Sequence, residues 1–227
     1  MHIKTRTNYF IVFSFLFSAF LAQSQVEQVR TLDSTAFASK LDSLRENCSY
    51  RKTFLPQFET EIISALSYYP ELDSTRIIFK EAKIKASLNA RPTIGSLLFR
   101  KRVNRKYVIR IKPNTGDSVA TLDQVGFNGA VGVLGHELNH IVDYSNRGIF
   151  RIIGRLFNYT NKKGKRRYEG EIDRMTVVKG LGWQLYDWED YVLNKSNAKA
   201  KYKAYKRAVY YSPNEVITFI EELEQQN

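Results

Sequence analysis

The sequence predicts an α+β protein that is mainly helical, with a small antiparallel sheet in front of its longest apolar helix. Apolar residues recur at helical spacing over most of the chain, and short runs in the middle alternate as strands do. We find no internal repeat and no low-complexity linker. The 227 residues and the 43% hydrophobic content therefore suit a single domain with a packed core, preceded by a short leader.

The N-terminal part of this domain, residues 25–70, is expected to be helical. Residues 33–47 and 54–68 both carry apolar side chains at helical spacing. The chain has a single cysteine, Cys48, which cannot form an intramolecular disulfide. We expect Cys48 to be a small buried apolar residue.

A small sheet with loops is expected over residues 76–127. Residues 76–86 alternate in part, and residues 107–112 alternate more cleanly before a Pro-Asn-Thr-Gly-Asp turn ends the run. These segments fit two or three antiparallel strands.

The remaining residues, 128–227, are expected to form a helical half. An apolar helix should run from about Asn128 to Tyr144, with Asn128 capping its start and Gly148 just beyond its end. Ser212 should cap the last helix, which has Pro213 in its first turn. The other helices predicted in this half cover residues 170–187 and 199–209, and the last one ends at Glu224.

The central helix carries a metal-binding pattern. Apart from His2 near the N-terminus, both histidines of the chain lie in His136-Glu137-Leu138-Asn139-His140, which reads H-E-x-x-H. Residues four apart project from one helix face, so His136 and His140 can present two imidazoles to one metal ion. Glu137 would then face the open coordination position. This pattern predicts a zinc site.

The third ligand is expected to be a carboxylate. A catalytic zinc normally takes three protein groups and leaves one position for water, and no third histidine follows the leader. Glu169 and Asp173 are four apart on an expected helix, which suits one for the metal and the other for the N–H of a ligand imidazole. Glu171 competes for the metal if this segment is extended at its start. The alternative interpretation of residues 169–173 is a solvated acidic helix start.

Two segments resemble the zinc metallopeptidases. Residues 133–142 match their extended pattern, in which uncharged residues surround H-E-x-x-H, and residues 168–173 resemble the E-x-x-x-D element of the gluzincins. The resemblance extends over about residues 128–187 and is at the level of the clan. It implies a zincin-like fold in which Glu169 is the third zinc ligand and Asp173 orients a ligand histidine.

These residues predict an exported zinc-dependent metallopeptidase that hydrolyses peptide bonds in a peptide or protein substrate. Zinc held by His136, His140 and Glu169 would activate a water molecule and polarise the substrate carbonyl. Glu137 would act as the general base and pass the proton to the leaving amine. The strand at residues 107–112 is expected to be the edge strand to which the peptide adds.

The alternative is a catalytically inactive, metallopeptidase-like zinc-binding module that binds an envelope or extracellular partner. Gluzincins commonly use a further His or Tyr to stabilise the tetrahedral oxyanion, and no histidine remains for this role. The sequence assigns it to no residue, and the tyrosine candidates are Tyr168, Tyr186, Tyr210 and Tyr211.

The first 24 residues have the features of a secretory signal peptide. Lys4 and Arg6 precede an almost wholly apolar run at residues 9–22, and small residues precede the expected cleavage after Ser24. This run falls short of the roughly twenty residues that a membrane-spanning helix needs. We expect a periplasmic or extracellular protein.

The net charge of the chain is +12, and about +10 remains after the leader. The basic residues gather in Arg100–Lys112, Arg147–Tyr168 and Lys195–Arg207, and the second cluster contains no acid. Nucleic acid is not an expected partner, because no recognition motif is present and the leader implies export. Solubility is the simpler role for these charges, and contact with an anionic membrane surface or cell wall is the alternative.

Residues 149–157 resemble an interfacial helix, because apolar residues are interspersed with Arg151 and Arg155. Burial of the apolar face against the core is the expected arrangement.

Overall fold

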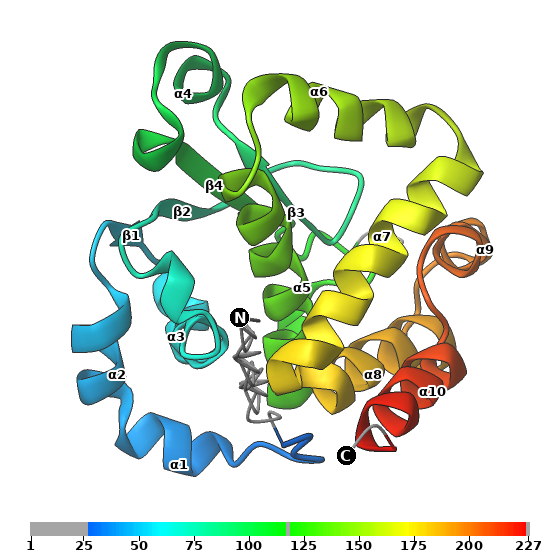
Figure 1. The fold of residues 1–227 in the computed structure, drawn as a ribbon. Helices are drawn as coiled ribbons and strands as arrows, with labels where there is room; N and C mark the ends of the chain where they lie inside the picture. The colour runs from blue at the N-terminus through cyan, green and yellow to red at the C-terminus, as the bar shows by residue number, and fades with distance from the viewer. Residues whose placement is uncertain (1–26, 117–118, 226–227) are drawn as a thin grey trace, which may run out of the picture.

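The computed structural model describes residues 27–116 and 119–225. The predicted signal peptide, residues 1–24, lies outside these ranges. The long helix α5 (Phe127–Ser145) occupies the centre, with α1–α3 on one side and α7–α10 on the other (Figure 1). Within the described ranges, each helix is too short or too polar to cross a membrane.

The N-terminal segment is helical, as predicted, but in shorter pieces. The helices are α1 (Ser34–Ser39), α2 (Leu41–Cys48) and α3 (Glu59–Leu66). The side chain of Asp33 caps α1 by accepting hydrogen bonds from the backbone N–H groups of Thr35 and Ala36. Cys48 is a free, buried thiol, as expected.

The sheet has four strands in the order β1-β2-β4-β3. Their bounds are Lys52–Thr53 for β1, Arg76–Glu81 for β2, Leu88–Pro92 for β3 and Lys106–Ile111 for β4. The β1–β2 and β2–β4 pairs are parallel, and only the β3–β4 pair is antiparallel.

The prediction of an antiparallel sheet was therefore wrong, because the sheet is mixed. Alternation along a strand reports which face is buried and carries no information on the direction of its neighbour. The connections set that direction: α3 links β1 to β2, and a segment containing β3 and α4 (Ile94–Phe99) links β2 to β4. The strand β3 was missed because its five residues, Leu-Asn-Ala-Arg-Pro, lack β-branched and aromatic side chains.

Helix α5 is buried along almost its whole length, from Gly129 to Tyr144. It packs against α3, α8 and the sheet, which explains why its apolar residues are not confined to one face. The predicted cap was wrong: Gly126 is the N-cap, and Asn128 instead accepts a hydrogen bond from the backbone N–H of Leu32 at 2.8 Å.

Two helices replace the one predicted over residues 170–187. Helix α7 (Lys162–Thr176) ends in a wide turn, Val177–Leu181, and α8 (Gly182–Asp190) follows. Gly180 breaks the helix because it adopts a φ of 86°, which favours glycine.

The C-terminal helices agree with the sequence. A second wide turn, Tyr191–Lys195, leads to α9 (Ala200–Val209) and then α10 (Pro213–Glu224). Ser212 caps α10 as predicted, and Glu215 completes a capping box. Short 3-10 turns, labelled η1 to η5, cover Pro56–Phe58, Pro70–Leu72, Arg102–Asn104, Leu122–Gln124 and Asn158–Thr160.

Helix α6 (Ile149–Phe157) departs from the expected burial of its apolar face. Ile152 points into the core, whereas Phe150, Ile153 and Phe157 are exposed. The expectation that this face packs on the core was therefore wrong for three of its large apolar residues.

The closest approach of α5 and α8 is at Gly132. A Cβ atom built there would lie 2.2 Å from the backbone carbonyl of Gln184. Because backbone cannot rotate away as a side chain can, we expect Gly132→Ala to push the helices apart and lower the free energy of unfolding by about 3 kcal/mol. Urea denaturation measures this loss.

Gly154→Ala is the matched control, because a Cβ on Gly154 of α6 meets nothing within 4 Å. That variant should gain about 0.5–1 kcal/mol from its higher helix propensity. A Gly132→Ala protein as stable as the Gly154→Ala protein would contradict the close approach of α5 and α8.

Candidate metal centre

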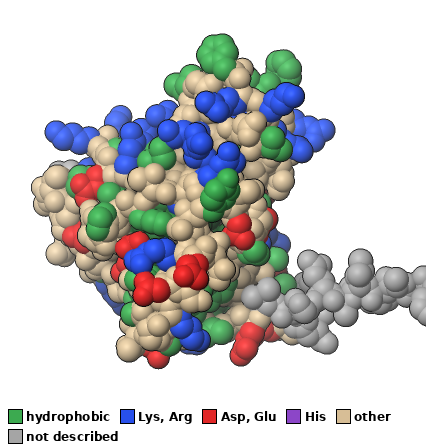
Figure 2. All heavy atoms as spheres, turned by 90° about the vertical axis from the view of Figure 1, so that its left-hand side faces the viewer, with side chains coloured by type: hydrophobic (Ala, Val, Ile, Leu, Met, Phe, Trp, Pro, Cys, Tyr) green, Lys and Arg blue, Asp and Glu red, His purple; other side chains and the backbone are tan. Residues whose placement is uncertain are grey.

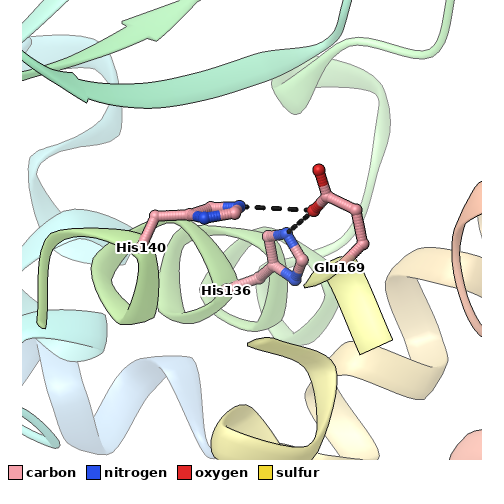
Figure 3. A group of neighbouring side chains, drawn as sticks. All are labelled: His136, His140 and Glu169. Carbon is pink, nitrogen blue, oxygen red and sulfur yellow. Dashed lines mark ion pairs between the residues drawn. The ribbon is translucent and has the colours of Figure 1, made fainter. Parts of the chain in front are cut away.

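Three buried side chains from two helices meet beside α5. His136 and His140 project from α5 one turn apart, and Glu169 reaches them from α7 (Figure 3). The Nε2 atoms of both histidines lie 3.3 Å from Oε2 of Glu169. The three groups offer ligand atoms that all lie within 4.8 Å of one another, so together they can hold a metal ion.

The structure separates the two candidates for the third ligand. Glu169 is 2% exposed and faces the histidines. The side chain of Glu171 is 44% exposed and forms an ion pair with Arg155 of α6. Segment 162–176 is helical throughout, which turns Glu171 away from the face shared by Glu169 and Asp173.

Hydrogen bonds on the far side of each ring fix the orientation of the histidines. Nδ1 of His136 lies 2.8 Å from Oδ1 of Asp173, and Nδ1 of His140 lies 3.3 Å from the hydroxyl of Tyr168. The Tyr168 hydroxyl donates its proton to Asp143, which leaves its oxygen to accept from His140. With Nδ1 as the donor in each neutral ring, both Nε2 lone pairs face Glu169.

One carboxylate oxygen of Glu169 has no hydrogen-bond partner, which indicates that a cation fits between the three side chains. Oε1 accepts a hydrogen bond from the Tyr159 hydroxyl at 2.8 Å, whereas the buried Oε2 has no hydrogen-bond partner. A buried carboxylate oxygen that faces two imidazole lone pairs is costly unless positive charge lies between them. A divalent cation with two nitrogen ligands and one oxygen ligand fits this arrangement.

The pKa values of these groups agree with a site built for positive charge. Burial lowers the pKa of His136, but hydrogen bonds and charges from Asp173 and Glu169 more than offset this and raise it to about 10. Burial raises the pKa of Glu169, yet the two histidines hold it well below its usual range. Both directions show surroundings that stabilise positive charge at this group, which a bound cation can supply.

Glu137 lies beside the ligands without joining them. Its side chain is buried at the cleft next to His136, and its Oε2 has no hydrogen-bond partner. Burial raises the pKa of Glu137, while the charges of His140 and His136 and a hydrogen bond from the Ala90 backbone oppose the rise. A carboxylate with a raised pKa is suited to accepting a proton.

A cleft of about 710 Å³ opens in front of Glu137. One wall is β3 with the residues just before it, and the opposite wall comes from α8 and α9. Exposed lysines on this lining include Lys85, Lys199 and Lys201. The cleft therefore connects His136 and Glu137 to a space that is large enough for several residues of a peptide.

The edge strand beside this cleft differs from the one predicted. Residues 107–112 were expected at the edge, but β4 is paired on both sides, and the edge strand is β3. The Thr93 N–H donates to the Lys106 carbonyl, and the Lys112 N–H donates to the Ser87 carbonyl. These two bonds determine which alternate residues of β3 direct their backbone groups toward β4. The backbone groups of Leu88 and Ala90 therefore point away from β4, toward the free edge.

The four tyrosine candidates for oxyanion stabilisation occupy different places. Tyr210 lines the cleft, with its ring centroid 5.9 Å from that of His136. Tyr168 lies behind His140 as its hydrogen-bond partner. Tyr186 packs on Trp183, and Tyr211 packs on Phe219. Of the four, Tyr210 is placed beside the metal ligands in the cleft.

Sequence reasoning missed a buried ion pair in the same cleft. Lys206 of α9 donates to Glu189 of α8 at 2.6 Å, and Lys206 also lies 3.6 Å from the ring centroid of Tyr210. The two residues are seventeen positions apart and belong to different helices, so no local spacing indicates the pair.

Asp173 should tune metal affinity without touching the metal. We expect Asp173→Asn to weaken zinc binding by about 10- to 100-fold, because the charged acceptor for the His136 ring is lost while the side-chain shape is kept. Competition with a chromophoric chelator measures the affinity. Asp187→Asn is the control, because Asp187 of α8 is half-buried and pairs with Arg30 instead of a metal ligand. Equal affinities for the two variants would contradict this role for Asp173.

Comparisons of the chain with protein-family models, with curated proteins and with solved structures found no match. The resemblance to the gluzincins therefore rests on the motif residues and their arrangement. Function has to be argued from the chemistry of this site.

Proposed function

We propose that this protein is an exported zinc-dependent metallopeptidase, with His136, His140 and Glu169 as zinc ligands and Glu137 as general base. One observation carries the proposal: the buried, unpaired oxygen of Glu169 faces two imidazole nitrogens at 3.3 Å, beside a cleft that Glu137 enters. Export rests on the leader at residues 1–24.

The donor set favours zinc over calcium and magnesium. Two imidazoles and one carboxylate form a three-ligand set that catalytic zinc uses, with one position left for water. Calcium and magnesium prefer oxygen ligands, which this group does not supply in sufficient number. Zinc bound here would polarise a substrate carbonyl and lower the pKa of a water molecule.

Glu137 supplies the proton transfers in this proposal. Its carboxylate accepts the proton of the attacking water and delivers it to the leaving amine, so no covalent intermediate with the protein is needed. The raised pKa of Glu137 makes it a stronger base than a solvated glutamate. The hydrogen bond from the Ala90 backbone orients the carboxylate toward the cleft.

The free edge of β3 supplies a place for an extended peptide. The backbone N–H and carbonyl of Leu88 and the carbonyl of Ala90 point to this edge and can pair with a substrate strand, while the Ala90 N–H is taken by Glu137. Exposed lysines on the cleft lining favour acidic side chains in the substrate. Tyr210 is the residue that we propose as donor to the tetrahedral oxyanion, because it lies in the cleft beside His136.

Mass spectrometry of a cleaved peptide library tests the activity. The chain from Gln25 onward, loaded with zinc, should generate new peptide termini, and a chelator should stop the cleavage until zinc is restored. The set of cleaved peptides should be enriched in acidic residues. The His140→Ala variant, offered zinc in the same way, should be inactive, because it lacks one proposed zinc ligand.

Zinc binding without cleavage of any library peptide would favour the inactive zinc-binding module over the peptidase. Replacement of Tyr210, the proposed oxyanion donor, also distinguishes the peptidase from the inactive module. Tyr210→Phe should slow cleavage and leave zinc affinity unchanged, because the tyrosine is not one of the proposed ligands.

A further inference from the structure

A cluster of exposed apolar side chains lies on α4, η3 and α6, away from the ligands of the metal site. Phe99 and Phe150 are 86% and 85% exposed, and Phe157 is 67% exposed. We call this cluster the apolar patch. Its members are Ile94, Leu98, Phe99, Val103, Phe150, Ile153 and Phe157.

The two segments of the apolar patch belong to one surface. Arg102 donates to the carbonyl of Asn146, and Arg105 donates to the carbonyl of Arg147 at 2.6 Å, so η3 is held against the turn before α6. Helices α4 and α6 lie together at the top of the molecule in Figure 1. In Figure 2, hydrophobic side chains project at the top, with Lys and Arg side chains gathered beneath them.

The outward orientation of α6 is fixed by its inner face. Phe150, Ile153 and Phe157 follow helical spacing and share the outer face. On the opposite face, Ile152 enters the core, and Arg155 pairs with Asp143 and Glu171. These anchors hold three large apolar side chains in water, where exposure of contiguous apolar surface is unfavourable and indicates an interaction site.

The charged residues within the two segments that carry the apolar patch are all positive. Neither residues 94–112 nor residues 146–168 contain an Asp or Glu. The exposed cations of these two segments include Arg100, Lys101, Arg102, Arg151, Lys162 and Lys163. Aromatic and aliphatic residues on one face, with Lys and Arg next to them, are the composition of helices that lie in the interface of an anionic bilayer.

We propose that α4, η3 and α6 form a membrane-docking face that inserts the apolar patch into an anionic lipid bilayer. The patch projects from the molecule, which suits entry between lipid headgroups, and the adjoining cations complement the phosphates. Docking of this kind would hold an exported protein at a membrane surface. The proposal is independent of the peptidase activity.

Vesicle sedimentation tests the docking face. The chain from Gln25 onward should bind vesicles of phosphatidylcholine mixed with phosphatidylglycerol more tightly than vesicles of phosphatidylcholine alone. Substituting Phe99→Ser, Phe150→Ser and Phe157→Ser together should weaken this binding by about tenfold or more, since each loses an inserted aromatic ring. Exposed side chains can be changed without loss of fold, which circular dichroism verifies.

The matched control is Tyr50→Ser with Val178→Ser, because both residues are exposed apolar side chains outside the apolar patch. This variant should bind like the unmodified chain. Substituting Arg100→Gln, Lys101→Gln and Arg151→Gln should reduce the preference for phosphatidylglycerol, by about fivefold per residue. All variants share one N-terminus, so their differences report only the substituted side chains.

Three results would overturn the proposal. The first is equal binding to both vesicle types, and the second is unchanged binding after the three phenylalanines are replaced. The third is self-association in solution that the phenylalanine substitutions abolish, without vesicle binding, which would make a second copy of the chain the occupant of the patch.

Discussion

Glu137→Gln should remove hydrolysis and keep the metal. Glutamine has the size of glutamate but cannot accept a proton from water, and Glu137 is not among the three proposed ligands. A positioned general base contributes about 100- to 10,000-fold, so we expect kcat/KM to fall by about 1,000-fold. Zinc affinity should stay within about threefold of the unmodified chain, because both histidines and Glu169 are untouched.

Peptide cleavage and zinc content should be measured on the same preparation. Glu171→Gln is the matched control, since it makes the same chemical change at an exposed position near the site. That variant should retain full activity. Hydrolysis at the unmodified rate by the Glu137→Gln protein, with zinc present, would rule out Glu137 as the base.

Glu169→Ala should release the metal. The substitution removes the ligand that reaches the two histidines from α7 and leaves a two-histidine site on a single helix. We expect zinc affinity to fall by more than about 100-fold, since the loss of a direct ligand costs more than the loss of a residue that only orients one. His140→Ala should have a comparable effect.

Competition with a zinc chelator measures these affinities, and Glu171→Ala is the control. Its carboxylate lies two residues away and pairs with Arg155, so its removal should leave zinc binding unchanged. The opposite pattern, with zinc lost in Glu171→Ala and kept in Glu169→Ala, would assign the third ligand to Glu171.

The metal group could be predicted because most of its geometry is local. The spacing of four places His136 above His140 on one helix face, and the same spacing relates Glu169 to Asp173. Only one long-range contact was needed, that between α5 and α7. The absence of a third histidine after residue 24 left a carboxylate as the natural ligand to complete the set.

The walls of the cleft could not be predicted in the same way. The edge position of β3 depends on which strands pair, and pairing is decided by crossover connections rather than by alternation within a strand. The buried Lys206–Glu189 pair joins two helices, and no sequence pattern in either helix indicates the partner in the other. For α6, helical spacing predicts an apolar face, but the ion pairs of Arg155 with Asp143 and Glu171 decide which face points inward.

Elemental analysis of the chain from Gln25 onward, purified without added metal, tests whether His136, His140 and Glu169 hold a zinc ion. We expect about one zinc per chain, bound by the two imidazoles and one carboxylate of a three-ligand site. Absence of metal, even after zinc is offered in excess, would contradict it. The H-E-x-x-H helix would then contribute only to packing.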